Sequence, residues 1–222
     1  MRKLITGIFF CIPILTTGQI ENEVSVTDLV SEIQQWNKKD NRMSLVWWIP
    51  TEYWGIALKD NKQIPQATVN QIENVFKDYM MIWACDLTIN ADGTIDYTAE
   101  EEIKKSIVVV AKNDKKYFPL TKEQIDAEAL AIAENMKPFF AQALGQMGRG
   151  LHFYFFKLTD ENGKTLVNAN LPGEFKVTHS NFDFPWKLPL PILMLPKFCP
   201  VDKEKMKGNW SYCPIHGQKL EN

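Results

Sequence analysis

The chain has 222 residues, of which 45% are hydrophobic, 23% charged and 12% aromatic. This is the composition of a globular protein, long enough for one sizeable domain with a small appendage, and it argues against disorder. The formal net charge of −2 provides no basic surface of the kind that binds nucleic acid or an anionic membrane.

The N-terminus has the parts of a secretory signal peptide over residues 1–18. Two basic residues precede an apolar segment at 4–15, which is too short to span a bilayer. Small residues at 16–18 then offer a cleavage site before Gln19. We therefore expect an exported protein, periplasmic or extracellular, that is not transmembrane once the signal has been removed.

The first half of the mature chain contains both helical and strand-like hydrophobic patterns. Leu29, Val30 and Ile33 recur at helical spacing, whereas residues 43–49 are rich in the β-branched and aromatic side chains that favour strands. Thr68 opens a capping box at the start of a longer apolar stripe. The predicted elements are a helix at 27–36, a strand at 43–49, a short strand or helical turn at 53–58, a helix at 65–83, and a hairpin with strands at 84–89 and 94–97.

The second half continues the alternation and ends in a proline-rich segment. Thr121 and Gln124 form a second capping box, and Pro138 is expected to kink or divide the helix that follows. The predicted elements are a charged solvated face or loop at 98–105, a strand at 106–111, a helix at 122–144, a hairpin with strands at 150–158 and 165–169, a strand at 174–179, and an extended strap at 181–198.

These elements predict an α+β fold, in which a mainly antiparallel sheet is packed by two main helices. Their order matches the β-α-β-β-α-β scheme of ferredoxin-like domains. The expected organisation is a signal peptide at 1–18, a body at 19–195 that includes most of the strap, and a small appendage at 199–222.

An aromatic cluster begins at the end of the first predicted strand and continues after it. Trp47, Trp48 and Trp54 lie close together in the sequence, with Tyr53 between them. Aromatic rings with polar handles can form a platform for a ligand. The same residues also suit the core beneath a sheet, and the sequence leaves both interpretations open.

The appendage contains the most specific pattern in the chain, a frame that occurs twice. Cys199-Pro-Val-Asp202 and Cys213-Pro-Ile-His216 each place a potential ligand at the third position after the cysteine. The second copy resembles the Cys-Pro-x-Cys-Gly-x-x-Leu knuckle of zinc ribbons, with histidine in place of the second cysteine. The first copy departs further, with Asp202 in the ligand position and Lys203 in the glycine position.

The resemblance implies a single zinc ion held by Cys199, Asp202, Cys213 and His216 in a closed structural site. With Asp202 unbound, three ligands would leave room for water. The alternative is a disulfide between Cys199 and Cys213, which would close a loop of about 15 residues and add about 3 kcal/mol of stability. Export favours the disulfide, and the duplicated frame favours the metal. Cys85 lies in an apolar run and is expected to be an inert core residue.

No catalytic motif accompanies these features, because Gly-x-Ser-x-Gly, His-Glu-x-x-His and Walker patterns are absent from the sequence. We therefore expect a non-enzymatic module that binds a partner protein or a small apolar ligand, with the appendage as a structural clasp. The alternative is a metal-dependent enzyme or metal-handling protein, with His152 or His179 added to the site by folding. The layout as a whole resembles exported bacterial proteins of unassigned function.

Overall fold

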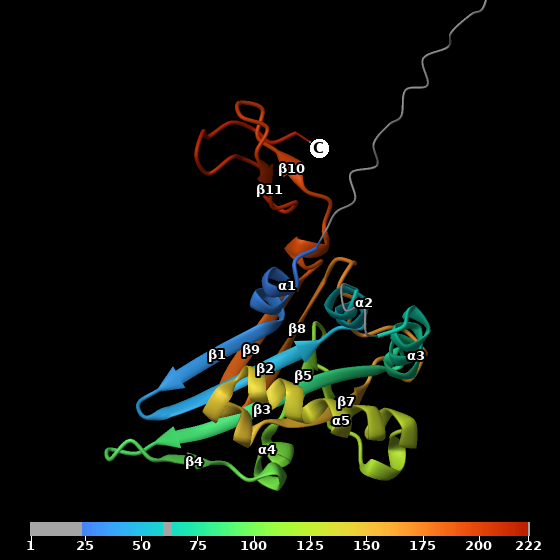
Figure 1. Cartoon of the computed structure of the whole chain (residues 1–222), viewed down its shortest axis with the longest axis vertical. Coiled ribbons are helices and arrows are strands. Elements are labelled where there is room, and N and C mark those ends of the chain that lie inside the picture. Colours follow the sequence, from blue (N-terminus) through green and yellow to red (C-terminus); the bar gives the residue numbers. More distant parts are fainter. Residues whose placement is uncertain (1–23, 60–63, 222) are drawn as a thin grey trace, which may run out of the picture.

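Two antiparallel sheets form the centre of the computed structural model, which describes residues 24–59 and 64–221 (Figure 1). The predicted signal peptide lies outside the described residues. Within them, no helix has the length and apolarity needed to cross a membrane.

The main sheet is built around β3, its longest strand. Its order is β1-β2-β3, and β4 and β7 both pair with β3, at different positions along it. All of these pairs are antiparallel. The strands are β1 (Gln34–Lys39), β2 (Arg42–Ile49), β3 (Tyr79–Ile89), β4 (Ile95–Tyr97) and β7 (His152–Lys157).

The second sheet has the order β6-β5-β8-β9 and is also antiparallel. Ser180 and Asn181, with φ of 53° and 67°, form the two-residue turn that joins β8 to β9. The strands are β5 (Val108–Ala111), β6 (Lys116–Tyr117), β8 (Gly173–His179) and β9 (Phe182–Leu188).

The main sheet is covered on both faces, and the neighbours Trp47 and Trp48 show how. Successive side chains of a strand point to opposite faces. Trp47 contacts Phe140 of α5, with ring centroids 5.0 Å apart, whereas Trp48 contacts Phe175 of β8 at 4.9 Å. One face therefore packs against helices and the other against the second sheet. The helices are α1 (Val26–Ile33), α2 (Glu52–Leu58), α3 (Gln66–Phe76), α4 (Glu100–Ser106) and α5 (Ala127–Ala143).

The predicted α+β class with mainly antiparallel sheets is confirmed. The ferredoxin-like arrangement is not what forms, because the strands divide between two sheets. The predicted strand at 174–179 pairs with the strand at 106–111 in the second sheet, and neither hydrogen-bonds to the main sheet.

The predicted helix at 65–83 was too long. The helix α3 ends at Phe76, and the chain enters β3 at Tyr79. From Met80 to Leu87 every residue of β3 is buried, because this strand is covered on both faces. The sequence of such a strand is a continuous apolar run. Here that run follows directly on the apolar positions of α3, so the sequence pattern does not show where the helix ends and the strand begins.

The predicted helix at 27–36 likewise ends early, at Ile33, and residues 34–39 form an edge strand of the main sheet. Residues 53–58 form the helix α2 rather than a strand. Most of the charged segment at 98–105 lies in the helix α4, so of the two alternatives it forms a solvated helix face rather than a loop. Its three glutamates fill the first turn and two lysines fill the last, which suits the helix dipole.

The strap predicted at 181–198 is partly a strand. Residues 182–188 form β9, and Pro185 is tolerated there because β9 pairs only with β8 among the described residues. The segment at 165–169 makes one bridge, between Thr159 and Thr165, and is not a strand.

Pro138 does not divide α5, which runs from Ala127 to Ala143. Buried Ala133 and Phe140 anchor the helix on both sides of the exposed proline. Packing therefore offsets the backbone hydrogen bond that proline removes.

Candidate functional site

The C-terminal residues 197–221, here called the ribbon, form a small unit at one end of the molecule (Figure 1). Its only named strands are β10 (Lys197–Phe198) and β11 (Lys205–Met206), which pair with each other. Met206 and Leu220, each seven residues after the cysteine of its frame, are buried with both ribbon cysteines in a cluster separate from the main core. The duplicated sequence pattern thus makes a small core of its own.

The two frames fold into the same turn, here called a knuckle. In each, the cysteine N–H donates to the carbonyl five residues later, over 3.0 Å for Cys199 and 2.8 Å for Cys213. The N–H of Lys203 and that of Gly217 donate back to the respective cysteine carbonyls over 2.8 and 2.9 Å. Both donor residues have left-handed backbone, with φ of 61° and 64°. The knuckles are therefore structural as well as sequence repeats.

These turns aim backbone N–H groups at sulfur. The N–H of His216 donates to Cys213 Sγ over 3.4 Å. Burial raises the pKa of the Cys213 thiol, but the N–H groups of His216 and Ile215, together with the side chains of His216 and Cys199, outweigh it and bring the pKa below its ordinary value. Burial keeps the pKa of Cys199 raised, although its own knuckle also supplies two N–H groups.

Cys199, Cys213 and His216 converge with geometry suited to one metal ion. Their ligand atoms all lie within 4.8 Å of one another. Nδ1 of His216 is 3.3 Å from Cys199 Sγ and 3.6 Å from Cys213 Sγ. A tetrahedral zinc ion with ordinary bond lengths separates sulfur from nitrogen by about 3.6 Å. The three side chains are therefore placed where such an ion needs them, with Nδ1 as the histidine ligand atom.

Asp202 lies at the edge of this group. Its Oδ2 is 3.7 Å from Nδ1 of His216, while its Oδ1 accepts the N–H of Glu204 over 3.0 Å. That hydrogen bond, together with contact with Cys199 and His216, lowers the pKa of the Asp202 carboxyl. The carboxylate is charged and near, but it does not belong to the three-residue cluster.

The disulfide predicted as the alternative is not formed, because Cys199 and Cys213 are both free. Cys85 is also free, is buried in β3, and donates to the carbonyl of Met147 over 3.3 Å. Burial raises the pKa of the Cys85 thiol to about 12, as befits an unreactive core residue.

Neither His152 nor His179 joins the cluster. His152 lies on β7, with its Nδ1 3.3 Å from a carboxylate oxygen of Glu100, and His179 ends β8 beside Ser106. Both therefore belong to the body of the protein. The prediction that folding adds one of them to the metal site is wrong.

The predicted tryptophan platform divides between two places. Trp47 and Trp54 line an apolar cavity beside α2 and α5. Trp48 points to the opposite face of the main sheet, where its ring lies 4.9 Å from Phe175 and 6.1 Å from Trp186. Trp48 is thus a core residue between the sheets.

A buried polar cluster around Asp86 escaped the sequence analysis. Asp86 is fully buried, and its two carboxylate oxygens share the single N–H of Arg42 Nε, over 3.1 and 3.0 Å, and accept further hydrogen bonds from Arg42 Nη2, Ser44 and Thr98. Burial raises the pKa of the Asp86 carboxyl, but these donors outweigh it and hold the pKa below its usual range. A single acid inside an otherwise apolar strand was the available signal.

His179 and Ser180 lie beside this cluster but do not form a nucleophile–base pair. Ser180 Oγ is 3.3 Å from Nδ1 and 3.1 Å from Nε2, so it lies over the ring face rather than along the lone pair of either nitrogen. Ser106 Oγ donates to the carbonyl of Ile103 and so accepts the Nδ1 proton of neutral His179. This arrangement is structural.

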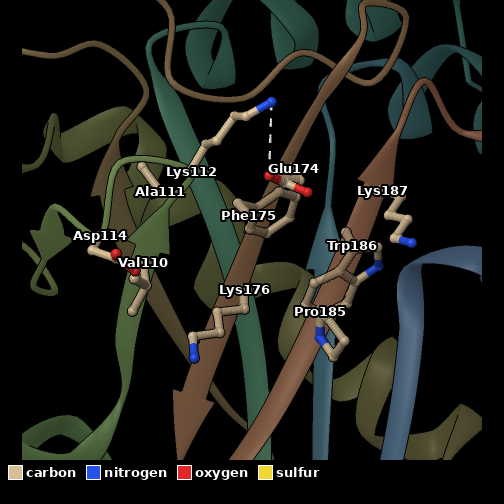
Figure 2. Close-up of a pocket in the computed structure, with 10 residues that line it drawn as sticks. All are labelled: Val110, Ala111, Lys112, Asp114, Glu174, Phe175, Lys176, Pro185, Trp186 and Lys187. Carbon is tan, nitrogen blue, oxygen red and sulfur yellow. Dashed lines mark ion pairs between the residues drawn. The ribbon is translucent and has the colours of Figure 1, made fainter.

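The outer face of the second sheet has a shallow pocket of about 210 Å³ whose rim carries three lysines (Figure 2). Lys112 is 3.8 Å from Glu174, the ion pair drawn in Figure 2, and Lys176 is 2.7 Å from Asp183. Because two of the lysines have acidic partners, the face has mixed charge rather than a basic patch.

Comparison of the chain with protein-family models, curated proteins and solved structures finds no match.

Proposed function

We propose that the protein is an exported, non-enzymatic binding module whose ribbon is closed by one zinc ion. The observation that carries the metal site is the convergence of Cys199, Cys213 and His216 from two equivalent knuckles. Two thiolates and an imidazole are a donor set that zinc prefers, and Asp202 is near enough to supply the fourth ligand by a small rotation. Four protein ligands would make the site a clasp rather than a reaction centre.

Metal analysis of the protein purified from a bacterial periplasm without added metal tests this proposal. We expect about one zinc ion per chain, and less than about a tenth of one in the variants Cys213→Ser and His216→Ala. Cys85→Ala is the matched control, because it removes a cysteine remote from the ribbon and should keep the zinc. Metal-free protein with Cys199 linked to Cys213 by mass spectrometry would contradict the proposal.

The fourth ligand has its own test. If Asp202 binds the ion, Asp202→Ala should weaken zinc affinity by about tenfold or more, and the spectrum of the cobalt-substituted protein should change. Glu204→Ala alters an acid in the same loop and should change neither. An unchanged cobalt spectrum in Asp202→Ala would assign the fourth position to water.

Export rests on the signal-like N-terminus. We propose cleavage before Gln19, which intact mass measurement of the periplasmic protein would show directly. A mature protein that still begins at Met1 would contradict it.

A metal-handling role is the second candidate, favoured by the exposed position of His216 at the surface of the ribbon. An ion held partly by an exposed ligand can be passed to an acceptor. Rapid transfer of zinc to a weak chelator would favour handling, whereas release only on unfolding of the ribbon would favour the clasp.

A further inference from the structure

An apolar cavity of the body lies where α2 and the C-terminal half of α5 meet above the main sheet. Its volume is about 380 Å³, and every described residue that lines it is apolar or aromatic. The aromatic walls come from three elements separated in the sequence, namely β2, α2 and α5. Trp47, Tyr53, Trp54, Phe139 and Phe140 supply these walls.

The walls are held in place by contacts among their own rings. Phe140 is 8% exposed and lies 5.0 Å from Trp47 and 6.3 Å from Trp54, in edge-to-face arrangements. The Tyr53 ring is 5.3 Å from that of Trp54, at 83°. Rings that support one another cannot easily turn to fill the space between them, so the cavity is preformed rather than a gap that side chains close.

Phe139 marks the rim of the cavity. It lines the space and yet is 73% exposed, whereas the next residue, Phe140, is buried. A large aromatic side chain at the open edge of an apolar cavity gains by covering an apolar occupant.

We propose that this cavity binds one small, neutral, apolar molecule, aromatic or compactly branched. A cavity of about 150 Å³ lined by apolar residues suffices for benzene, so this one accommodates a molecule of two fused or linked rings. None of the described residues that line it is charged, so they offer an ionised ligand no compensation for its lost hydration. This inference rests on the proposal that the body is a binding module and does not depend on the zinc clasp.

The neutral fluorophore N-phenyl-1-naphthylamine, titrated into the purified mature protein, tests the inference. We expect a saturable, blue-shifted increase in fluorescence with a stoichiometry of about one. Ala143→Phe, at the end of α5, and Ala57→Phe, in α2, each place a ring in the cavity and should weaken binding by about tenfold or more.

Ala131→Phe is the matched control, because Ala131 is an exposed alanine of α5 that does not line the cavity. This variant should bind the fluorophore with the affinity of the parent. Absence of saturable binding, or equal binding by the two cavity variants and the parent, would overturn the inference and mean that the protein's own chain fills the space. Zinc content measured on the same samples separates this result from failure of the clasp, because zinc-loaded protein without fluorophore binding rejects the cavity alone.

Discussion

Lys203 and Gly217 occupy the same position in two successive knuckles, and both have left-handed backbone, with φ of 61° and 64°. A glycine adopts this conformation without strain, whereas a lysine carries a Cβ that it disfavours. The second knuckle therefore has the residue that the turn requires, and the first has one that the surrounding hydrogen bonds must hold in place. The ribbon is a repeat whose two halves are unequally optimised.

Substitutions at these two positions should have opposite effects on zinc affinity. Gly217→Ala meets no neighbouring atom, so its cost is conformational, about 1 kcal/mol. Because the ribbon folds with its metal, this cost should appear as about fivefold weaker zinc affinity in a chelator competition, and Lys203→Gly should strengthen affinity by a similar factor. Gly163→Ala, at a left-handed turn of the body, should leave zinc affinity unchanged. An unaltered affinity in Gly217→Ala would show that the ribbon is folded without metal.

Removal of the metal should unfold the ribbon and leave the body intact. The ribbon core has only four buried residues and is separate from the main cluster. A unit of this size does not fold without a cross-link or an ion. After treatment with a chelator, hydrogen exchange should accelerate in peptides from 197–221 and stay slow in β2 and β3. Equal acceleration throughout the protein would show that ribbon and body fold as one unit.

The buried Asp86 should matter far more for stability than an exposed acid in an ion pair. Asp86→Ala leaves Arg42, Ser44 and Thr98 without their acceptor, and we expect a loss of about 3 kcal/mol, moderated because Arg42 can turn towards water. Asp183→Ala, which removes the exposed partner of Lys176, should cost less than about 1 kcal/mol. Urea unfolding at neutral pH measures both, and equal losses would contradict the assignment of Asp86 as a buried anchor.

His179 should make stability depend on pH in the mildly acidic range. Burial lowers its pKa from 6.5 to about 4, with the nearby charges of Asp86 and Arg42 acting in opposite directions. His179 and Glu102 line one cavity between the sheets' ends, so this carboxylate also faces it. Between these two values the unfolded chain binds the proton and the folded chain does not. The contribution of neutral His179 to the unfolding free energy is therefore fully present above about pH 6.5. It is lost as the pH drops to about 4, which lowers the unfolding free energy by about 3 kcal/mol.

The variant His179→Gln isolates this contribution. Between about pH 6.5 and 4, the unfolding free energy of this variant should fall by less than that of the parent, because the contribution of His179 is missing. Urea titration of both proteins at several pH values measures the difference. Thr178→Ala, on the opposite face of β8, should keep the parental slope. Identical slopes for parent and His179→Gln would show that the imidazole is protonated in the folded state.

The sequence determined the features that depend on neighbours along the chain. The candidate ligands of the ribbon all lie between Cys199 and His216, and the turns that place them are closed by hydrogen bonds within each knuckle. For the same reason the capping box at Thr121 and Gln124 was predictable and is present. The choice between metal cluster and disulfide was not local, because it depends on how the two knuckles face each other.

Only the tertiary structure decided what depends on residues far apart in the chain. Arg42 and Asp86 are 44 residues apart and meet because β2 pairs with β3. Arg42 and Ser180 are 138 residues apart and meet because the two sheets pack together. The helix α3 ends at Phe76, although the apolar pattern continues into β3. That pattern continues because β3 is buried on both faces, which only the packing of the layers decides. The separation of Trp48 from Trp47 and Trp54 has the same origin. A strand sends neighbouring side chains to opposite faces, and only packing of the layers makes one face a cavity wall and the other a core.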